Sequence, residues 1–179
     1  MSISTHALLS AEERSRLAAM PELGGGNLLA TAMAVHPDPH IPFIRTGRPV
    51  TNTAGEEQTE FTLAQIDALA QSWSVWYHHQ GVGPRDRVAL YMDDTFAYTI
   101  HLNALAQLGA IGVLINSKAS PALALGLCER TTPVGIYTDR SRLATITEGI
   151  GSLDGLRWVQ LADDLPAPPA AALPEAWRF

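Results

Sequence analysis

Four oxygen-bearing side chains follow short apolar runs that we predict to be strands, namely Asp93, Asp94, Asn116 and Asp139. Ligands of open α/β sheets bind at the edge where the carboxyl ends of parallel strands meet, so these side chains are expected near one another. Carboxylate and amide oxygens suit Mg²⁺, which makes a receiver-like or phosphatase-like site one interpretation. The other is that Asp and Asn cap the helices that follow. We favour capping. A phosphoacceptor aspartate of a receiver-like site is flanked by one strand that carries Thr and another that carries Lys, and no strand-end aspartate of this chain has such neighbours.

Three further groups could do chemistry, and each has a simpler structural interpretation. Gly24-Gly25-Gly26 could bind phosphate through backbone amides, but no strand precedes it and no Lys-Ser/Thr follows. His36 and His40 belong to an H-P-D-P-H sequence without an evident third metal ligand, which predicts a surface turn. Cys128 lies among apolar residues of a helix, as is typical of a buried, inert thiol. We therefore predict no metal site and no catalytic residue in this chain.

Helices alternate with short apolar strands between residues 61 and 139. Thr62 begins a capping-box sequence, T-L-A-Q, and Gly81 ends the helix in the left-handed conformation that glycine adopts readily. Trp73 and Trp76 of this helix are expected in the core. Two more helices are predicted at 96–108 and 121–131, with strands at 87–92, 110–115, 134–138 and 156–161. The prediction is an α/β fold, mainly a parallel sheet with helices on both faces.

Both ends of the chain are less regular. Ser10 to Glu13 form a second capping box for a helix to about Met20, and residues 27–35 look helical. Residues 41–45 and 59–61 are expected to form an antiparallel hairpin across the polar loop 46–58. From Ala162 onward the sequence is rich in Pro and Ala. We therefore divide the chain into an N-terminal helical extension (1–26), an α/β subdomain (27–161) and a tail or linker (162–179).

Length and composition fit one ordinary globular domain. At 179 residues the chain can bury a core without metals or disulfides, and its single cysteine excludes an internal disulfide. The formal charge of −6, with interspersed signs, gives no basic face for nucleic acid. No apolar run has the length of a membrane span, and the first residues lack the basic-then-apolar order of a signal peptide. We expect a cytoplasmic location and no transmembrane segment.

The central residues resemble the N-terminal subdomain of the adenylate-forming superfamily, which includes acyl-CoA synthetases, aryl-CoA ligases, luciferases and peptide-synthetase adenylation domains. Asp86-Arg87-Val88-Ala89-Leu90 is similar to its D-R-V-A-L strand, and residues 108–116 are similar to its A-G-A-V-V-V-P-L-N sequence. His36-Pro37-Asp38 and Phe61-Thr62 resemble two earlier motifs. The resemblance extends over residues 27–139.

The chain also departs from the family pattern. Asp93-Asp94 stands where the family has Pro-Asn, and Leu114 replaces a common proline, as in fatty-acyl members. The family's phosphate loop, rich in Ser, Thr and Gly and ending in Pro-Lys-Gly, does not occur here, and the only lysine is Lys118 in N-S-K-A-S. The C-terminal domain that donates the family's catalytic lysine is also missing. We therefore expect a fragment truncated before the phosphate loop and inactive by itself.

The resemblance implies a parent enzyme that is an AMP-forming carboxylate–CoA ligase. That enzyme would use ATP, Mg²⁺ and CoA to convert a carboxylic acid, such as a fatty acid, into an acyl adenylate and then a thioester. This chain would bind none of these cofactors by itself and would pack on the rest of the enzyme, or self-associate through the exposed face. The alternative is a stand-alone, non-catalytic, receiver-like α/β module for binding or regulation. Candidates for one wall of the acyl or pantetheine channel are Asp93, Asp94, Thr95, Phe96, Asn116 and Lys118.

Overall fold

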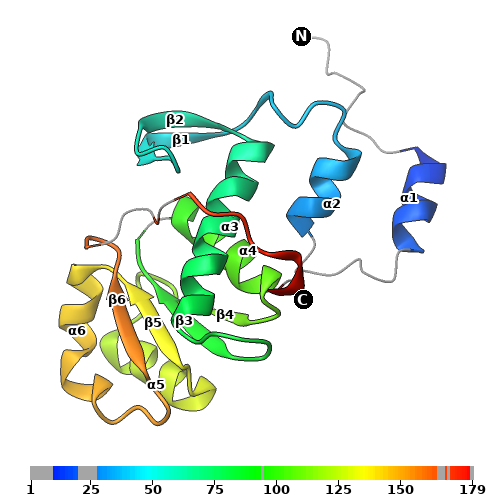
Figure 1. Ribbon diagram of the computed structural model, residues 1–179. Coiled ribbons are helices and arrows are strands. Elements are labelled where there is room, and N and C mark those ends of the chain that lie inside the picture. Colours follow the sequence, from blue (N-terminus) through cyan, green and yellow to red (C-terminus); the bar gives the residue numbers. More distant parts are fainter. Residues whose placement is uncertain (1–9, 20–27, 94, 165–167, 169, 178–179) are drawn as a thin grey trace.

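The computed structural model describes residues 10–19, 28–93, 95–164, 168 and 170–177 (Figure 1). A parallel sheet lies at the centre of these residues. In spatial order its strands are β4 (Ile111–Leu114), β3 (Arg87–Tyr91), β5 (Gly135–Thr138) and β6 (Trp158–Leu161). The structure thus confirms the predicted α/β class with a mainly parallel sheet. None of the helices in the described residues is long and apolar enough to cross a membrane.

Helices cover both faces of the sheet, as predicted. They are α3 (Leu63–His79) and α4 (Thr95–Gln107) on one face, and α5 (Pro121–Thr131) and α6 (Arg140–Ile150) on the other. Alternate residues of β3 enter two separate cores: Val88 and Leu90 pack with α3 and α4, whereas Ala89 and Tyr91 pack with α5 and α6. This alternation follows from the strand's period of two residues. The continuous apolar sequence of β3 is therefore explained by burial on both faces.

The helix starts follow from short polar sequences. At α3, the Thr62 hydroxyl accepts a hydrogen bond from the Gln65 amide (3.2 Å), and the Gln65 side chain accepts one from the Thr62 amide (2.9 Å). The predicted capping box is therefore present. Gly81 follows α3 with φ +76°, the left-handed conformation expected of it. Ser120 caps α5, with Pro121 at the first helical position.

The N-terminal elements agree with the sequence in kind but not always in length. They are α1 (Ala11–Ala18), α2 (Leu28–Val35) and an antiparallel hairpin of β1 (Pro42–Thr51) and β2 (Glu57–Thr62). The predicted loop 46–58 is too long, because polar residues within it pair across the hairpin. Asn52 closes the actual turn by accepting hydrogen bonds from the amides of Ala54 (2.8 Å) and Glu56 (3.0 Å). Both strands are mostly exposed, so their sequences need no apolar alternation.

Strand β4 forms at its predicted place but lies at an edge of the sheet. Its only strand partner among the described residues is β3. Ile111 and Leu114 are consequently 45% and 51% exposed. The apolar sequence of this strand did not predict its edge position, since apolarity does not distinguish an edge strand from a central one.

The segment after Ala162, expected to be a tail, contacts α3 in its described part. The Ala171 amide donates to the Ser72 hydroxyl (3.1 Å), and the Leu173 amide donates to the Gln71 side chain (3.2 Å). Leu173 is buried in the core formed by α3 and α4. A single 3₁₀ turn, η3 (Glu175–Trp177), then brings the Trp177 ring onto His78, with ring centroids 3.8 Å apart.

The close approach of β5 to β6 predicts a large effect of Gly135→Ala. A Cβ at Gly135 would lie 2.1 Å from ring atoms of Trp158, which itself packs against Trp76 and Tyr77. We expect the free energy of unfolding to fall by about 1–3 kcal/mol, the usual range for overpacking. Gly126→Ala in α5 is the matched control, because its Cβ would meet nothing within 4 Å. It should stabilise by about 0.5–1 kcal/mol.

Denaturant unfolding followed by circular dichroism measures both variants. Equal free energies of unfolding for Gly135→Ala and the wild type would show that Trp158 moves aside without loss.

Candidate functional site

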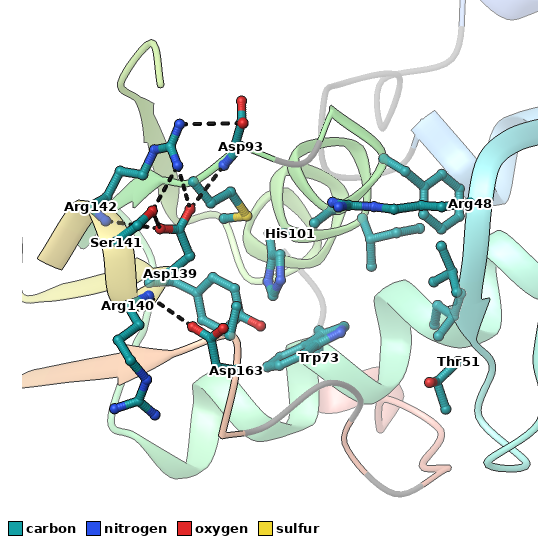
Figure 2. Close-up of a pocket in the computed structure, with 18 of the residues that line it drawn as sticks. Arg48, Thr51, Trp73, Asp93, His101, Asp139, Arg140, Ser141, Arg142 and Asp163 are labelled. Carbon is teal, nitrogen blue, oxygen red and sulfur yellow. Dashed lines mark hydrogen bonds and ion pairs between the residues drawn. The ribbon is translucent and has the colours of Figure 1, made fainter. Parts of the chain in front are cut away.

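A cavity of about 870 Å³ lies at the carboxyl edge of the sheet, between the hairpin and the ends of β3 and β5 (Figure 2). Residues from β1, α3, α4, β5 and α6 line it, together with the segments after β3 and after β6. This is the edge at which ligands of open α/β sheets bind. Its polar and aromatic lining includes Arg48, Trp73, Asp93, Phe96, His101, Tyr137, Asp139, Arg140, Ser141, Arg142 and Asp163.

Aromatic side chains form the floor of the cavity. The His101 ring contacts both Trp73 and Tyr137, with centroid separations of 4.3 and 4.0 Å, and those two rings contact each other at 5.2 Å. All three are nearly fully buried. Tyr77, one turn along α3 from Trp73, places its hydroxyl 2.9 Å from His101 Nδ1. Burial raises the pKa of Tyr77 well above its ordinary value, with a further contribution from Tyr137, so this phenol stays protonated. The floor is therefore aromatic and held by an internal hydrogen bond.

Asp139 organises the polar rim. Its carboxylate caps α6 by accepting from the Arg142 amide (2.9 Å), and it also accepts from the Ser141 hydroxyl (2.6 Å) and the Asp93 amide (3.1 Å). Burial opposes the charge of Asp139. The Ser141 and Arg142 hydrogen bonds, the Arg142 charge and the Asp93 amide outweigh burial and lower the pKa of Asp139 below its ordinary value. The carboxylate thus joins the end of β3 to the start of α6.

Arg142 balances two carboxylates of the rim (Figure 2). Its guanidinium lies 3.3 Å from Asp93 and 3.6 Å from Asp139, and it donates to Ser141 Oγ at 2.8 Å. The Arg142 side chain is 23% exposed, whereas that of Asp93 is 67% exposed. Nearby, Arg140 is held by its amide to Asp163 (2.8 Å) and by its guanidinium to Asp164 (2.8 Å). The carboxylates Asp93, Asp139 and Asp164 at this rim are therefore paired with arginine side chains.

The structure brings only some of the predicted site residues together. Asp93 and Phe96 line the cavity, whereas Asp94 and the side chain of Thr95 lie outside what is described. Asn116 instead shapes a turn, because its side chain accepts from the Lys118 amide (2.8 Å). Lys118 lines a separate cavity of about 330 Å³ on the other side of Arg142.

Of the oxygen-bearing set, Asp93, Asn116 and Asp139 have structural partners in the described chain, whereas Asp94 lies outside it. Asp139 is a helix cap, as the capping interpretation predicts. Asn116 instead forms a turn, and the cap of α5 is Ser120. Within the described ranges, no three His, Cys, Asp or Glu side chains are grouped so that they could hold a metal ion. The Mg²⁺ interpretation therefore has no support in this part of the chain.

The other three groups from the sequence can be placed in part. His36 accepts from the Asp38 amide and Asp38 accepts from the His40 amide, so H-P-D-P-H is a surface turn. Cys128 is buried, and burial, with Glu129, raises the pKa of its thiol to about 11, as expected of an inert cysteine. Gly24-Gly25-Gly26 lies outside the described residues.

Sequence reasoning missed Arg142, Ser141 and His101 as residues of the site. One signal was available for Arg142. Two arginines in the first turn of α6 oppose the helix dipole, which favours acidic residues there. Such an exception indicates that another interaction stabilises the arginines in this position. Here that interaction is ion pairing with the carboxylates at the rim. No local signal marked His101, because its neighbours come from α3 and β5.

Comparison with known proteins identifies the family. The model of the family described as AMP-binding enzyme matches residues 35–177. The chain therefore belongs to this family, and the resemblance to adenylate-forming enzymes is confirmed. The solved structure of the anthranilate CoA ligase AuaEII in complex with anthranoyl-AMP has a TM-score of 0.63 at 18% identity, over 88% of this chain and 30% of that one. At this identity the likeness shows the fold alone.

Two curated relatives are more similar in sequence. A 3-aminoavenalumate diazotase of Streptomyces sp is 31% identical over 172 residues, which is 96% of this chain and 30% of that protein. A 3-amino-2-hydroxy-4-methoxybenzoate diazotase of Streptomyces cremeus is 30% identical over 123 residues, 69% of this chain and 22% of that protein. The chain thus spans less than a third of each relative.

Asp139 provides a test of the rim. Asp139→Ala removes the cap of α6, and we expect the free energy of unfolding at pH 7 to fall by about 1 kcal/mol. Asp139→Asn keeps a capping oxygen but loses the charge, so an intermediate loss is expected. The folded-state pKa of Asp139 is lowered, so the contribution of its charge is present above the ordinary value of 3.8 and is lost as the pH falls below it.

The measurement is denaturant unfolding of the wild type and both variants as a function of pH. The difference between the wild type and Asp139→Asn should stay constant from pH 7 to near 3.8 and shrink as the pH falls below that value. A difference that grows toward acid pH would contradict this account.

Proposed function

We propose that this chain forms one wall of the substrate cavity of an adenylate-forming enzyme. The supporting observation is the cavity at the carboxyl edge of the sheet, with its apolar aromatic floor and its charged rim. A substrate with a ring or another apolar body and a polar end fits this cavity, with the apolar part against the floor and the polar end at the rim. Apolar pockets with a few convergent polar groups are the usual form of small-molecule sites.

The residues at hand fit the substrate side of such an enzyme better than the nucleotide side. Adenylation needs positive charge at the transferring phosphate, from a metal ion, backbone amides or lysine. Here Arg140 and Arg142 are paired with carboxylates, and the described residues hold no cluster suited to Mg²⁺. We therefore assign this chain no step of the nucleotide chemistry, and ATP and Mg²⁺ belong to the proposal for the whole protein.

The first candidate reaction is carboxylate activation followed by transfer to CoA. An acid oxygen attacks the α-phosphorus of ATP and releases pyrophosphate, and the CoA thiolate then displaces AMP to give a thioester. Family membership supports adenylation, and a CoA ligase shares the fold. Fatty acids are included as substrates because Leu114 stands where the family has a common proline. ATP and CoA are cytoplasmic metabolites, so the proposal includes a cytoplasmic location.

The second candidate is diazotisation of an aromatic amine. Both curated relatives reported above are diazotases, and the first is 31% identical over nearly the whole chain. Chemically, nitrite can take the place of the carboxylate: it displaces pyrophosphate from ATP, and the amine nitrogen attacks the activated nitrogen and releases AMP. Loss of water then gives the diazonium ion. The aromatic floor of the cavity suits an aryl amine as well as an aryl acid.

The experiment uses the natural protein with every residue that its gene encodes. Exchange of labelled pyrophosphate into ATP is measured with aromatic acids, with fatty acids, and with nitrite in the presence or absence of an aryl amine. We expect exchange that depends on one of these oxyanions. Acid-dependent exchange with thioester formation on adding CoA supports the first candidate, and nitrite-dependent AMP release with an aryl amine supports the second. No exchange with any of them would refute the proposal.

The 179-residue chain by itself is the matched control. It contains no Ser/Thr/Gly-rich loop ending in Pro-Lys-Gly, so we expect no exchange above background from it. Robust exchange by this chain would mean that the nucleotide chemistry lies within these residues.

A further inference from the structure

The carboxylate of Asp93 occupies a position that a ligand's anionic group could take. It lies at the rim of the cavity and pairs with Arg142 at 3.3 Å. The Asp93 backbone is held separately, because its amide donates to Asp139. The side chain of Asp93 can therefore turn away while the main chain stays in place.

The two ion pairs of Arg142 differ in strength. Asp139 is 22% exposed and is fixed by hydrogen bonds from Ser141, from the Arg142 amide and from the Asp93 amide. Asp93 is 67% exposed, and among the described residues its carboxylate pairs with the Arg142 side chain alone. Exposed pairs contribute little to stability because water screens them. Exchange of Asp93 for another anion therefore costs little, whereas Asp139 keeps the guanidinium in place.

We propose that Arg142 is a specificity-determining residue of the cavity, and that it binds the anionic group of the ligand in exchange for Asp93. This inference rests on the proposed function, since it assigns the ligand of the same cavity. The ligand class is a carboxylate on an apolar ring: the carboxylate contacts Arg142 at the rim, and the ring lies against the apolar floor beside Phe96 and Ile100. Planar guanidinium is well matched to a carboxylate.

The cavity floor supports the apolar part of this assignment. Leu69, Ile100 and Trp73 line it, and each is 3% exposed. A bound ring would therefore be shielded from water on that side, which favours burial of apolar area. The same shielding would strengthen the contact between Arg142 and the carboxylate, because screening is weaker where water is excluded.

The experiment is a titration of the chain with benzoate, followed by NMR of the backbone amides. Benzamide, which has the same shape without the charge, is the matched ligand. We expect Asp93→Asn to tighten benzoate binding about fivefold, because Arg142 no longer has a competing carboxylate. Arg142→Gln should weaken binding at least tenfold, and Arg142→Lys should retain part of the affinity. Benzamide binding should be the same in the wild type and in Asp93→Asn.

A matched pair of control substitutions lies at the opposite edge of the sheet. Arg157 pairs with Asp86 at 3.2 Å, with side chains 46% and 32% exposed, and neither residue lines the cavity. Arg157→Gln and Asp86→Asn remove the same charges and should leave benzoate affinity unchanged within twofold. These controls show whether a change in benzoate affinity comes from the Arg142–Asp93 pair itself or only from the change in net charge.

The inference is overturned if benzoate shows no binding up to its solubility limit, or if Asp93→Asn binds it no more tightly than the wild type. Should Arg142→Gln unfold, Asp93→Asn still decides the question, because its backbone contact with Asp139 does not involve the substituted group. Pyrophosphate exchange by the natural protein is a separate readout. Exchange without any effect of Asp93→Asn on affinity would reject this inference and leave the proposed function standing.

Discussion

The parallel pairing of β3 on both of its sides is the constraint on which the rest of the structure depends. Val88 to Tyr91 are buried, and their backbone bonds to β4 on one side and to β5 on the other. Parallel neighbours must be joined by crossovers, so α4 and α5 return the chain across opposite faces. As a result the carboxyl ends of the strands meet at one edge, and the cavity lies there.

The strand ends at this edge are not equivalent, and side-chain hydrogen bonds explain why. The Thr138 hydroxyl of β5 donates to the Tyr91 carbonyl of β3 (2.6 Å), and the Asp93 amide donates to Asp139. These bonds hold the ends of β3 and β5 together and expose Asp93 and Arg142 to the same cavity. The loop after β4 is shaped internally by Asn116 and borders the smaller cavity. The site is therefore a property of the β3–β5 pair.

Interactions that are local in sequence were predictable. The capping boxes at Ser10 and Thr62, the proline start of α5 and the left-handed Gly81 each depend on residues within one helical turn. The order of helices and strands followed from them, and so did the edge at which polar residues collect. What failed depends on neighbours distant in the chain. The edge position of β4, the length of the hairpin and the contact of residues 171–177 with α3 are set by pairing that no local pattern encodes.

The same division applies to the candidate site. Asp93 and Phe96 could be nominated from their place after β3, because the carboxyl end of a parallel strand is the usual location of ligand contacts. His101 could not, since its place in the floor depends on Tyr77 and Trp73 of α3 and on Tyr137 of β5. Arg142 could be predicted in part. A cation in the first turn of a helix is unfavourable in isolation, which indicates that it has partners, but the structure is needed to identify them.

The departure from the family sequence at Asp93 has a direct structural consequence. The resemblance places proline there, and proline has no amide hydrogen to donate. The hydrogen bond from the Asp93 amide to Asp139 therefore exists only because of this departure. The carboxylate that pairs with Arg142 comes from the same substitution. One residue thus supplies both the link between the strand ends and the counter-charge at the rim. At this position, therefore, the polar rim differs from the family pattern that the resemblance gives.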